Sequence, residues 1–144
     1  MTTASVPASG LGFGPVRMVG VTTALALAAI HLVEMPEDYE EMPYLGVLFG
    51  IGGVLLLTAV IGLTRRSWSR IAWATGSLVA AGMFAGYVMS RTVGLPGMDV
   101  EPWGEPLGVL SLVLETVFLA AAAAALVASS RTREEVKAAG TART

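Results

Sequence analysis

Four long apolar stretches constrain the fold of this chain more than any other feature of its sequence. They run over residues 16–33, 44–64, 71–90 and 106–129; the second and third contain no charged residue, and the fourth contains one, Glu115. A transmembrane helix needs about 20 mostly apolar residues, and a helix satisfies its own backbone hydrogen bonds in lipid. The sequence therefore predicts an all-α integral membrane protein, a four-helix bundle within residues 15–130.

The composition agrees with a membrane protein and excludes several classes of site. Of the 144 residues, 54% are hydrophobic and only 14% are charged, whereas soluble domains carry about 25% charged residues. The chain has no Cys and one His, which excludes disulfides, thiolate metal sites, iron–sulfur clusters and a bis-His haem from one chain. The net charge of −2 argues against a nucleic-acid partner. The apolar composition makes the lipid bilayer the expected environment.

The charged residues outside the apolar stretches separate by sign. Eight of the nine basic residues lie before the first stretch, between the second and third, or after the fourth: Arg17, Arg65, Arg66, Arg70, Arg131, Arg133, Lys137 and Arg143. Eight of the eleven acidic residues lie in the other two connections: Glu34, Glu37, Asp38, Glu40, Glu41, Asp99, Glu101 and Glu105. Because Lys and Arg concentrate in cytoplasmic loops, we predict a multi-pass protein of the plasma membrane with both termini cytoplasmic and two acidic loops outside.

The ends of the chain differ from its apolar centre. Residues 1–14 are rich in Ser, Thr, Gly and Pro, and the basic cytoplasmic tail, 131–144, ends in small and polar residues from Ala138. Neither end is expected to have regular structure. A signal peptide is the alternative interpretation of the first apolar stretch, although about 18 residues is long for the apolar region of such a peptide.

The two acidic loops share short strings that suggest an internal duplication. The pattern V-x-x-P occurs at 33–36 and at 93–96, and P-(x)-L-G-V-L follows each, from Pro43 and from Pro106. A duplication would make residues 16–66 and 76–128 tandem helical hairpins, related by a pseudo-twofold axis along the membrane normal. Coincidence is the alternative, because Leu, Gly and Val are abundant in this chain.

Small and aromatic residues predict how the helices pack and where they meet the lipid headgroups. Small residues let membrane helices approach closely, and the third stretch has two such stripes, Ala72–Gly76–Ala80 and Gly82–Gly86–Ser90. Both stripes are therefore expected to pack against neighbouring helices of the same chain, and a dimer interface is the alternative. Trp68 and Trp73 flank the start of the third stretch and are expected at the membrane interface, where indole rings are enriched.

Glu115 is the residue that most strongly suggests a site. It lies roughly 13 Å into the fourth stretch, at 1.5 Å per residue, and an ionisable group at that depth is costly unless it is paired or faces a cavity. Arg91 is its preferred ion-pair partner, and Asp99 or Glu101 are alternative partners for Arg91. His31 lies at a matching depth, on the same helix face as Glu34. A structural contact between helices is the alternative to a ligand site.

Two overlapping sets of residues are candidate ligands. The predicted polar binding site consists of His31, Glu34, Arg91 and Glu115. A predicted metal site adds thioether and carboxylate groups and consists of His31, Glu34, Met35, Met98, Asp99 and Glu101. Thioethers with imidazole favour copper, whereas carboxylates suit harder divalent cations. A solvated acidic cap without a metal is the alternative interpretation of the loops, and no catalytic residue set is evident.

Three strings carry a resemblance to known proteins: H-L-V-E-M-P-E-D-Y-E-E-M-P-Y-L-G from His31, S-R-T-V-G-L-P-G from Ser90 and E-P-W-G-E-P-L-G from Glu101. They resemble uncharacterised small four-span integral membrane proteins of high-GC, actinobacterial-type bacteria. The resemblance covers about a third of the chain, both outer loops and the adjoining helix ends, and implies a four-span membrane fold. It implies no activity and no site residues.

The sequence supports three functions. The favoured one is binding of a cation or small polar ligand at an outward-facing acidic site, with no enzymatic activity. The second is a non-catalytic accessory subunit whose acidic loops contact a membrane protein partner. The third is a small proton-coupled transporter or enzyme that uses Glu115.

Overall fold

The computed structural model describes residues 14–141, and within them it contains helices and no strands. The elements are α1 (Pro15–Glu41), α2 (Pro43–Thr64), the short 3-10 helix η1 (Arg66–Trp68), α3 (Ser69–Thr92) and α4 (Pro106–Thr141). Each of the four α-helices contains a span that is long and apolar enough to cross a membrane. The predicted all-α four-helix bundle is confirmed. The expectation for residues 1–14 falls almost entirely outside the described residues.

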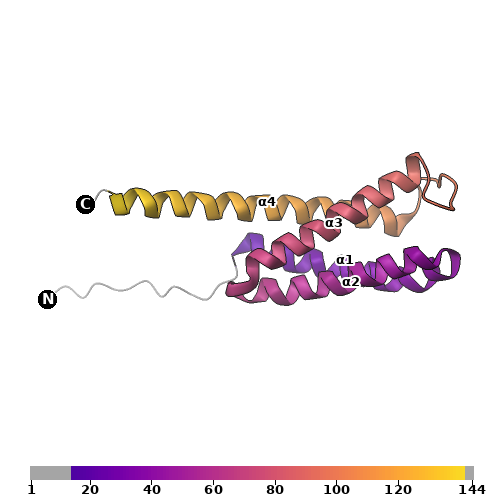
Figure 1. Cartoon of the computed structure of the whole chain (residues 1–144), viewed down its shortest axis with the longest axis horizontal. Coiled ribbons are helices and arrows are strands. Elements are labelled where there is room, and N and C mark those ends of the chain that lie inside the picture. The colour runs from indigo at the N-terminus through magenta and orange to yellow at the C-terminus, as the bar shows by residue number, and fades with distance from the viewer. Residues whose placement is uncertain (1–13, 142–144) are drawn as a thin grey trace.

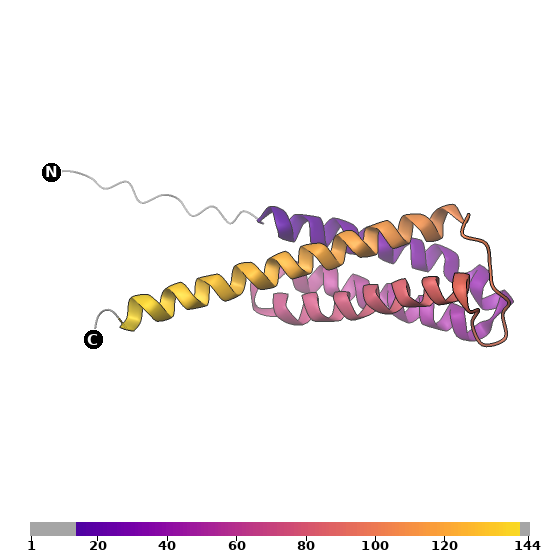
Figure 2. The same ribbon diagram turned by 90° about the horizontal axis from the view of Figure 1, so that it is seen from above.

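The helices form a bundle in which α1 and α3 each contact both α2 and α4. The α1–α2 junction and the irregular α3–α4 loop, residues 93–105, lie at one end of the bundle, and η1 lies at the other (Figure 1 and Figure 2). The end of the bundle with the α1–α2 junction and the α3–α4 loop is named the acidic end. Its acidic residues are Glu34, Glu37, Asp38, Glu40, Glu41, Asp99, Glu101 and Glu105. The other is named the basic end and carries Arg17, Arg65, Arg66 and Arg70. Helix α4 extends beyond the other helices at the basic end (Figure 2).

Two helices are longer than the apolar stretches that predict them. Helix α1 continues through Pro36 to Glu41, so the acidic string after Pro36 is helical, and only Met42 separates α1 from α2. Helix α4 continues through Thr141, so the tail expected to lack structure from Ala138 is helical up to that residue. The sequence after Arg131 is rich in Arg, Glu, Lys and Ala, which are strong helix formers.

The strings that suggest a duplication adopt different conformations. Residues 33–36 belong to α1, whereas 93–96 belong to the loop that follows α3. That loop has positive φ angles at Gly94 (80°) and Gly97 (84°), a backbone conformation that favours glycine. The two connections therefore differ locally, and superposition of the two hairpins stays a prediction.

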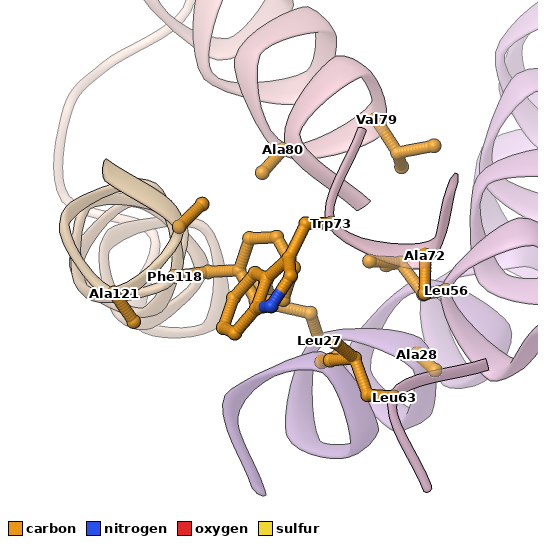
Figure 3. Packing of buried hydrophobic residues seen from close by; sticks show 12 residues of the cluster. Leu27, Ala28, Leu56, Leu63, Ala72, Trp73, Val79, Ala80, Phe118 and Ala121 are labelled. Carbon is orange, nitrogen blue, oxygen red and sulfur yellow. The ribbon is translucent and has the colours of Figure 1, made fainter. Parts of the chain in front are cut away.

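The apolar core lies in the half of the bundle nearer the basic end. It is built from buried residues of all four helices, among them Leu27, Leu56, Trp73 and Phe118 (Figure 3). The rings of Trp73 and Phe118 lie 5.3 Å apart. Trp73 is only 8% exposed, so the prediction that its indole ring anchors the chain among the lipid headgroups is wrong. Gly20 of α1 explains this position, since a Cβ there would overlap the indole ring.

The two small-residue stripes of α3 have different surroundings. In the first, Ala72 lies against Gly62 of α2, and the ring of Phe118 lies over Gly76. This stripe packs helices together, as predicted. In the second, a Cβ added at Gly82 or Gly86 would meet no atom within 4 Å. The expectation that these two glycines pack against a neighbouring helix is therefore wrong.

Candidate functional site

A cavity of about 390 Å³ lies among the four helices at the acidic end. Helix α1 contributes polar side chains to it, α2 contributes apolar and aromatic ones, and α3 contributes glycines and Arg91. The α3–α4 loop and α4 close the rest of the wall with Met98, Glu101, Glu105, Ser111 and Glu115. The four residues of the predicted polar site, His31, Glu34, Arg91 and Glu115, all line this cavity.

The floor of the cavity is formed by His31, Ser111 and Glu115, and it is almost fully buried. Glu115 is 1% exposed and His31 is 2% exposed. The Ser111 hydroxyl donates a hydrogen bond of 3.0 Å to Glu115 Oε1. His31 Nε2 lies 3.9 Å from the same oxygen, which is too far for a hydrogen bond. The imidazole ring also has an edge contact with the ring of Phe49, with 5.1 Å between ring centroids.

Several polar atoms of the floor lack a hydrogen-bond partner within the described part of the chain. They are both ring nitrogens of His31 and Oε2 of Glu115. More than nine in ten buried polar groups in proteins have such a partner, counting ordered water. A ligand or water molecule that reached the floor of the cavity would satisfy these atoms.

The rim of the cavity is formed by Arg91, Glu101 and Glu105. The guanidinium group of Arg91 forms ion pairs with both carboxylates and lies over the ring of Tyr87, 4.7 Å from its centroid. The backbone N–H of Glu101 donates to the carbonyl of Ser90 at 3.1 Å, which brings the loop back over the end of α3. The preferred prediction, an ion pair between Arg91 and Glu115, is therefore wrong. Arg91 pairs with its alternative partner Glu101 and with Glu105.

The cavity carries a large excess of acidic groups. Its lining contains seven carboxyl groups, those of Glu34, Glu37, Asp38, Glu41, Glu101, Glu105 and Glu115, and one guanidinium group, that of Arg91. Glu34 and Asp38 of α1 interact electrostatically with Glu105 on the other side of the cavity. Like charges at short range repel strongly in a poorly solvated site, so a positively charged ligand would relieve this repulsion.

The six predicted metal ligands are only partly brought together. His31, Glu34, Met98 and Glu101 line the cavity, whereas Met35 and Asp99 do not. The sulfur of Met35 lies beside Gly50, at 2.9 Å from the position that a Cβ would take there. Over residues 14–141, no group of three or more His, Asp or Glu side chains is arranged to hold a metal ion.

Several cavity residues were not predicted from the sequence. Ser111 lies one helical turn before Glu115, and this spacing was a usable signal, because residues four apart share a helix face. Tyr44, Phe49 and Tyr87 give the cavity an aromatic wall. Tyr44 also donates a hydrogen bond of 2.9 Å to the carbonyl of Pro96. Nothing in the sequence distinguishes these rings from others that face lipid.

Comparison with protein-family models, curated proteins and solved structures finds no match for this chain.

Proposed function

We propose that this chain is a multi-pass membrane protein that binds a cation in the cavity at its acidic end. The observation that carries the proposal is the charge of the lining. Arg91 is paired with Glu101 and Glu105. Among the side chains that the structure describes, the other five carboxyl groups have no Lys or Arg partner: Glu34, Glu37, Asp38, Glu41 and Glu115. Uncompensated carboxylates around a partly enclosed space attract a cation in preference to a neutral or anionic molecule.

The aromatic wall favours an organic ammonium ion among the cations that could bind. Tyr44 and Phe49 border the same space as the carboxylates, and quaternary ammonium groups bind well over aromatic faces. A metal ion is supported less, because Met35 and Asp99 lie outside the cavity lining. A site of about 390 Å³ also falls within the usual range for small organic ligands, about 300–1,000 Å³.

We further propose that the acidic end faces the outside of the plasma membrane. Support comes from Arg65, Arg66 and Arg70, which lie in or beside the short connection at the opposite end. Basic residues in short connections favour the cytoplasmic side. The cavity would then receive its ligand from outside the cytoplasm.

Choline and its neutral isostere 3,3-dimethylbutan-1-ol provide a direct test. The purified full-length protein is titrated with each compound by calorimetry, with Ca²⁺ and Cu²⁺ chloride as further probes. We expect saturable choline binding and at least about tenfold weaker binding of the isostere, which corresponds to the loss of about 1.4 kcal/mol.

Two variants with the same change of charge separate the cavity from the acidic surface. Glu115→Gln keeps the shape of the cavity floor and should weaken choline binding at least about tenfold. Glu40→Gln changes an exposed residue of the acidic end that does not line the cavity, and screening by salt should keep its effect small. Equal binding of choline and its isostere, or equal effects of the two variants, would contradict the proposal.

A further inference from the structure

The cavity is open on one side, between α2 and α3. Leu48 of α2 and Gly82 of α3 both line the cavity, yet Leu48 is 51% exposed and Gly82 is also exposed. Residues that line a cavity and are exposed to the surroundings mark an opening. We name this opening the fissure and define it by Leu45, Leu48, Phe49, Gly82 and Gly86.

The packing of α2 against α3 explains where the fissure begins. The two helices are in tight contact where Ala72 lies against Gly62 and where Met83 lies against Gly52. Toward the acidic end, the ribbon of α3 rises away from α2 (Figure 1). At Gly82 and Gly86 a Cβ would meet nothing within 4 Å. These glycines therefore leave room for a chain of atoms to pass between the helices.

The fissure opens at a depth where lipid chains surround the protein. Gly82 lies ten residues before the end of α3 at Thr92, which is roughly 15 Å along the helix axis. The hydrocarbon layer of a bilayer is about 30 Å thick, so the opening faces this layer. The side chains that border the fissure, Leu45, Leu48 and Phe49, carry no charge. An alkyl chain can therefore enter the cavity from the hydrocarbon layer of the bilayer.

We infer that the ligand of this cavity is a single-chain cationic amphiphile that enters from the membrane. Its ammonium head would lie among Glu115, Glu34 and Asp38, and its alkyl chain would leave through the fissure. This inference rests on the proposed cation site and adds the chemical class and the route of the ligand. Two features support it independently of the acidic residues: the opening itself and the unpartnered ring nitrogens of His31, which is 2% exposed and lines the floor.

The charge of the cavity selects against an anionic lipid. The only permanently cationic side chain in the lining is Arg91, and Glu101 and Glu105 already pair with it. An anionic head group would have to displace these carboxylates and would still face Glu34 and Asp38. A neutral alkyl chain in the fissure would gain little over its place in the bilayer, because lipid is equally apolar. Preference for the site must therefore come from the positive head group.

Photolabelling within a bilayer tests the inference. The full-length protein, in nanodiscs of phosphatidylcholine, is irradiated with an alkyltrimethylammonium probe that carries a diazirine in its chain, and labelled residues are identified by mass spectrometry. We expect labelling of the fissure residues. Excess dodecyltrimethylammonium should reduce this labelling at least about tenfold, whereas dodecyl sulfate should not.

Substitutions on α3 locate the labelling. Gly82→Leu places a side chain in the fissure without a clash at Cβ, so the protein should fold and lose the competed labelling. Ala81→Leu, an exposed neighbour that does not line the cavity, should fold and keep the competed labelling. Unchanged competed labelling in Gly82→Leu would show that the chain does not use the fissure.

Choline binding separates failure of the inference from failure of the cation site. If choline binds but labelling spreads evenly over all lipid-facing residues, or dodecyl sulfate competes as well as the cation, the amphiphile is wrong and the cation site stands. If choline does not bind and no labelling is competed, both are wrong.

Discussion

At the scale of single residues, Arg91 organises the rim of the cavity. Its side chain is 4% exposed and pairs with Glu101 and Glu105, and its guanidinium group lies over the ring of Tyr87. One buried guanidinium thus connects the last turn of α3 with two points of the α3–α4 loop. Such contacts fix geometry more than they add stability, because a buried charge is costly to desolvate.

Arg91→Gln should therefore loosen the α3–α4 loop while the bundle stays folded. The variant loses charge-assisted hydrogen bonds, which are each typically worth about 1.5–3 kcal/mol, and leaves two neighbouring carboxylates without their cation. We expect faster cleavage by chymotrypsin after Trp103, an exposed residue of this loop that Gly104 follows. Arg70→Gln, an exposed change at the basic end, is the control and should cleave like the parent protein. Equal cleavage of all three proteins would mean that Arg91 does not hold the loop.

At the scale of secondary-structure elements, helix contacts depend on single glycines. Gly20 of α1 accommodates Trp73 of α3, and Gly76 of α3 accommodates Phe118 of α4. The two aromatic rings then pack against each other in the core (Figure 3). A short chain of contacts, each made close by a missing side chain, thus connects α1, α3 and α4.

Gly20→Ala should destabilise the bundle by about 1–3 kcal/mol, the usual cost of overpacking a dense core. The added Cβ would overlap the indole of Trp73, which has no open space to enter. Gly82→Ala is the matched control: its Cβ meets nothing within 4 Å, and Ala is favoured over Gly inside a helix by about 0.5–1 kcal/mol. In thermal unfolding in detergent, only Gly20→Ala should have a lower midpoint temperature than the parent protein. A similar change in both variants would contradict this packing.

The sequence predicts that the four helices exist better than it predicts which side of each helix faces the core. The four apolar stretches predict four helices because length and hydrophobicity alone define a membrane span. A membrane helix is apolar toward both its neighbours and the lipid, so its sequence does not reveal which side faces inward. For this reason the inward position of Trp73 and the open surroundings of Gly82 and Gly86 could not be predicted.

For the candidate site, the sequence likewise predicts which residues belong to it but not how they pair. His31, Glu34, Arg91 and Glu115 stand out because charged or polar residues are rare at such depth, and depth alone placed them near one another. Their pairing could not be predicted, since it depends on the path of the α3–α4 loop. That loop returns over α3 by the hydrogen bond from Glu101 to Ser90 and brings Glu101 and Glu105 to Arg91 ahead of Glu115.

At the scale of the whole molecule, charge is separated between the two ends of the bundle. The cavity opens at the acidic end, and the η1 connection with its arginines lies at the other end (Figure 2). Because the charges are separated in this way, the orientation of the protein decides on which side of the membrane the cavity lies. If the basic end lies in the cytoplasm, as basic connections favour, the acidic cavity faces away from it.

Cysteine labelling in intact cells tests this orientation without background, because the chain contains no Cys. Glu40→Cys and Asp99→Cys place thiols at exposed positions of the acidic end, and Ser67→Cys places one at an exposed position in η1. A membrane-impermeant maleimide should label the first two in whole cells and should label Ser67→Cys only after the cells are lysed. The reverse pattern would place the cavity on the cytoplasmic side. The cation site would then lie in the cytoplasmic half of the membrane, because the cavity lies at the acidic end.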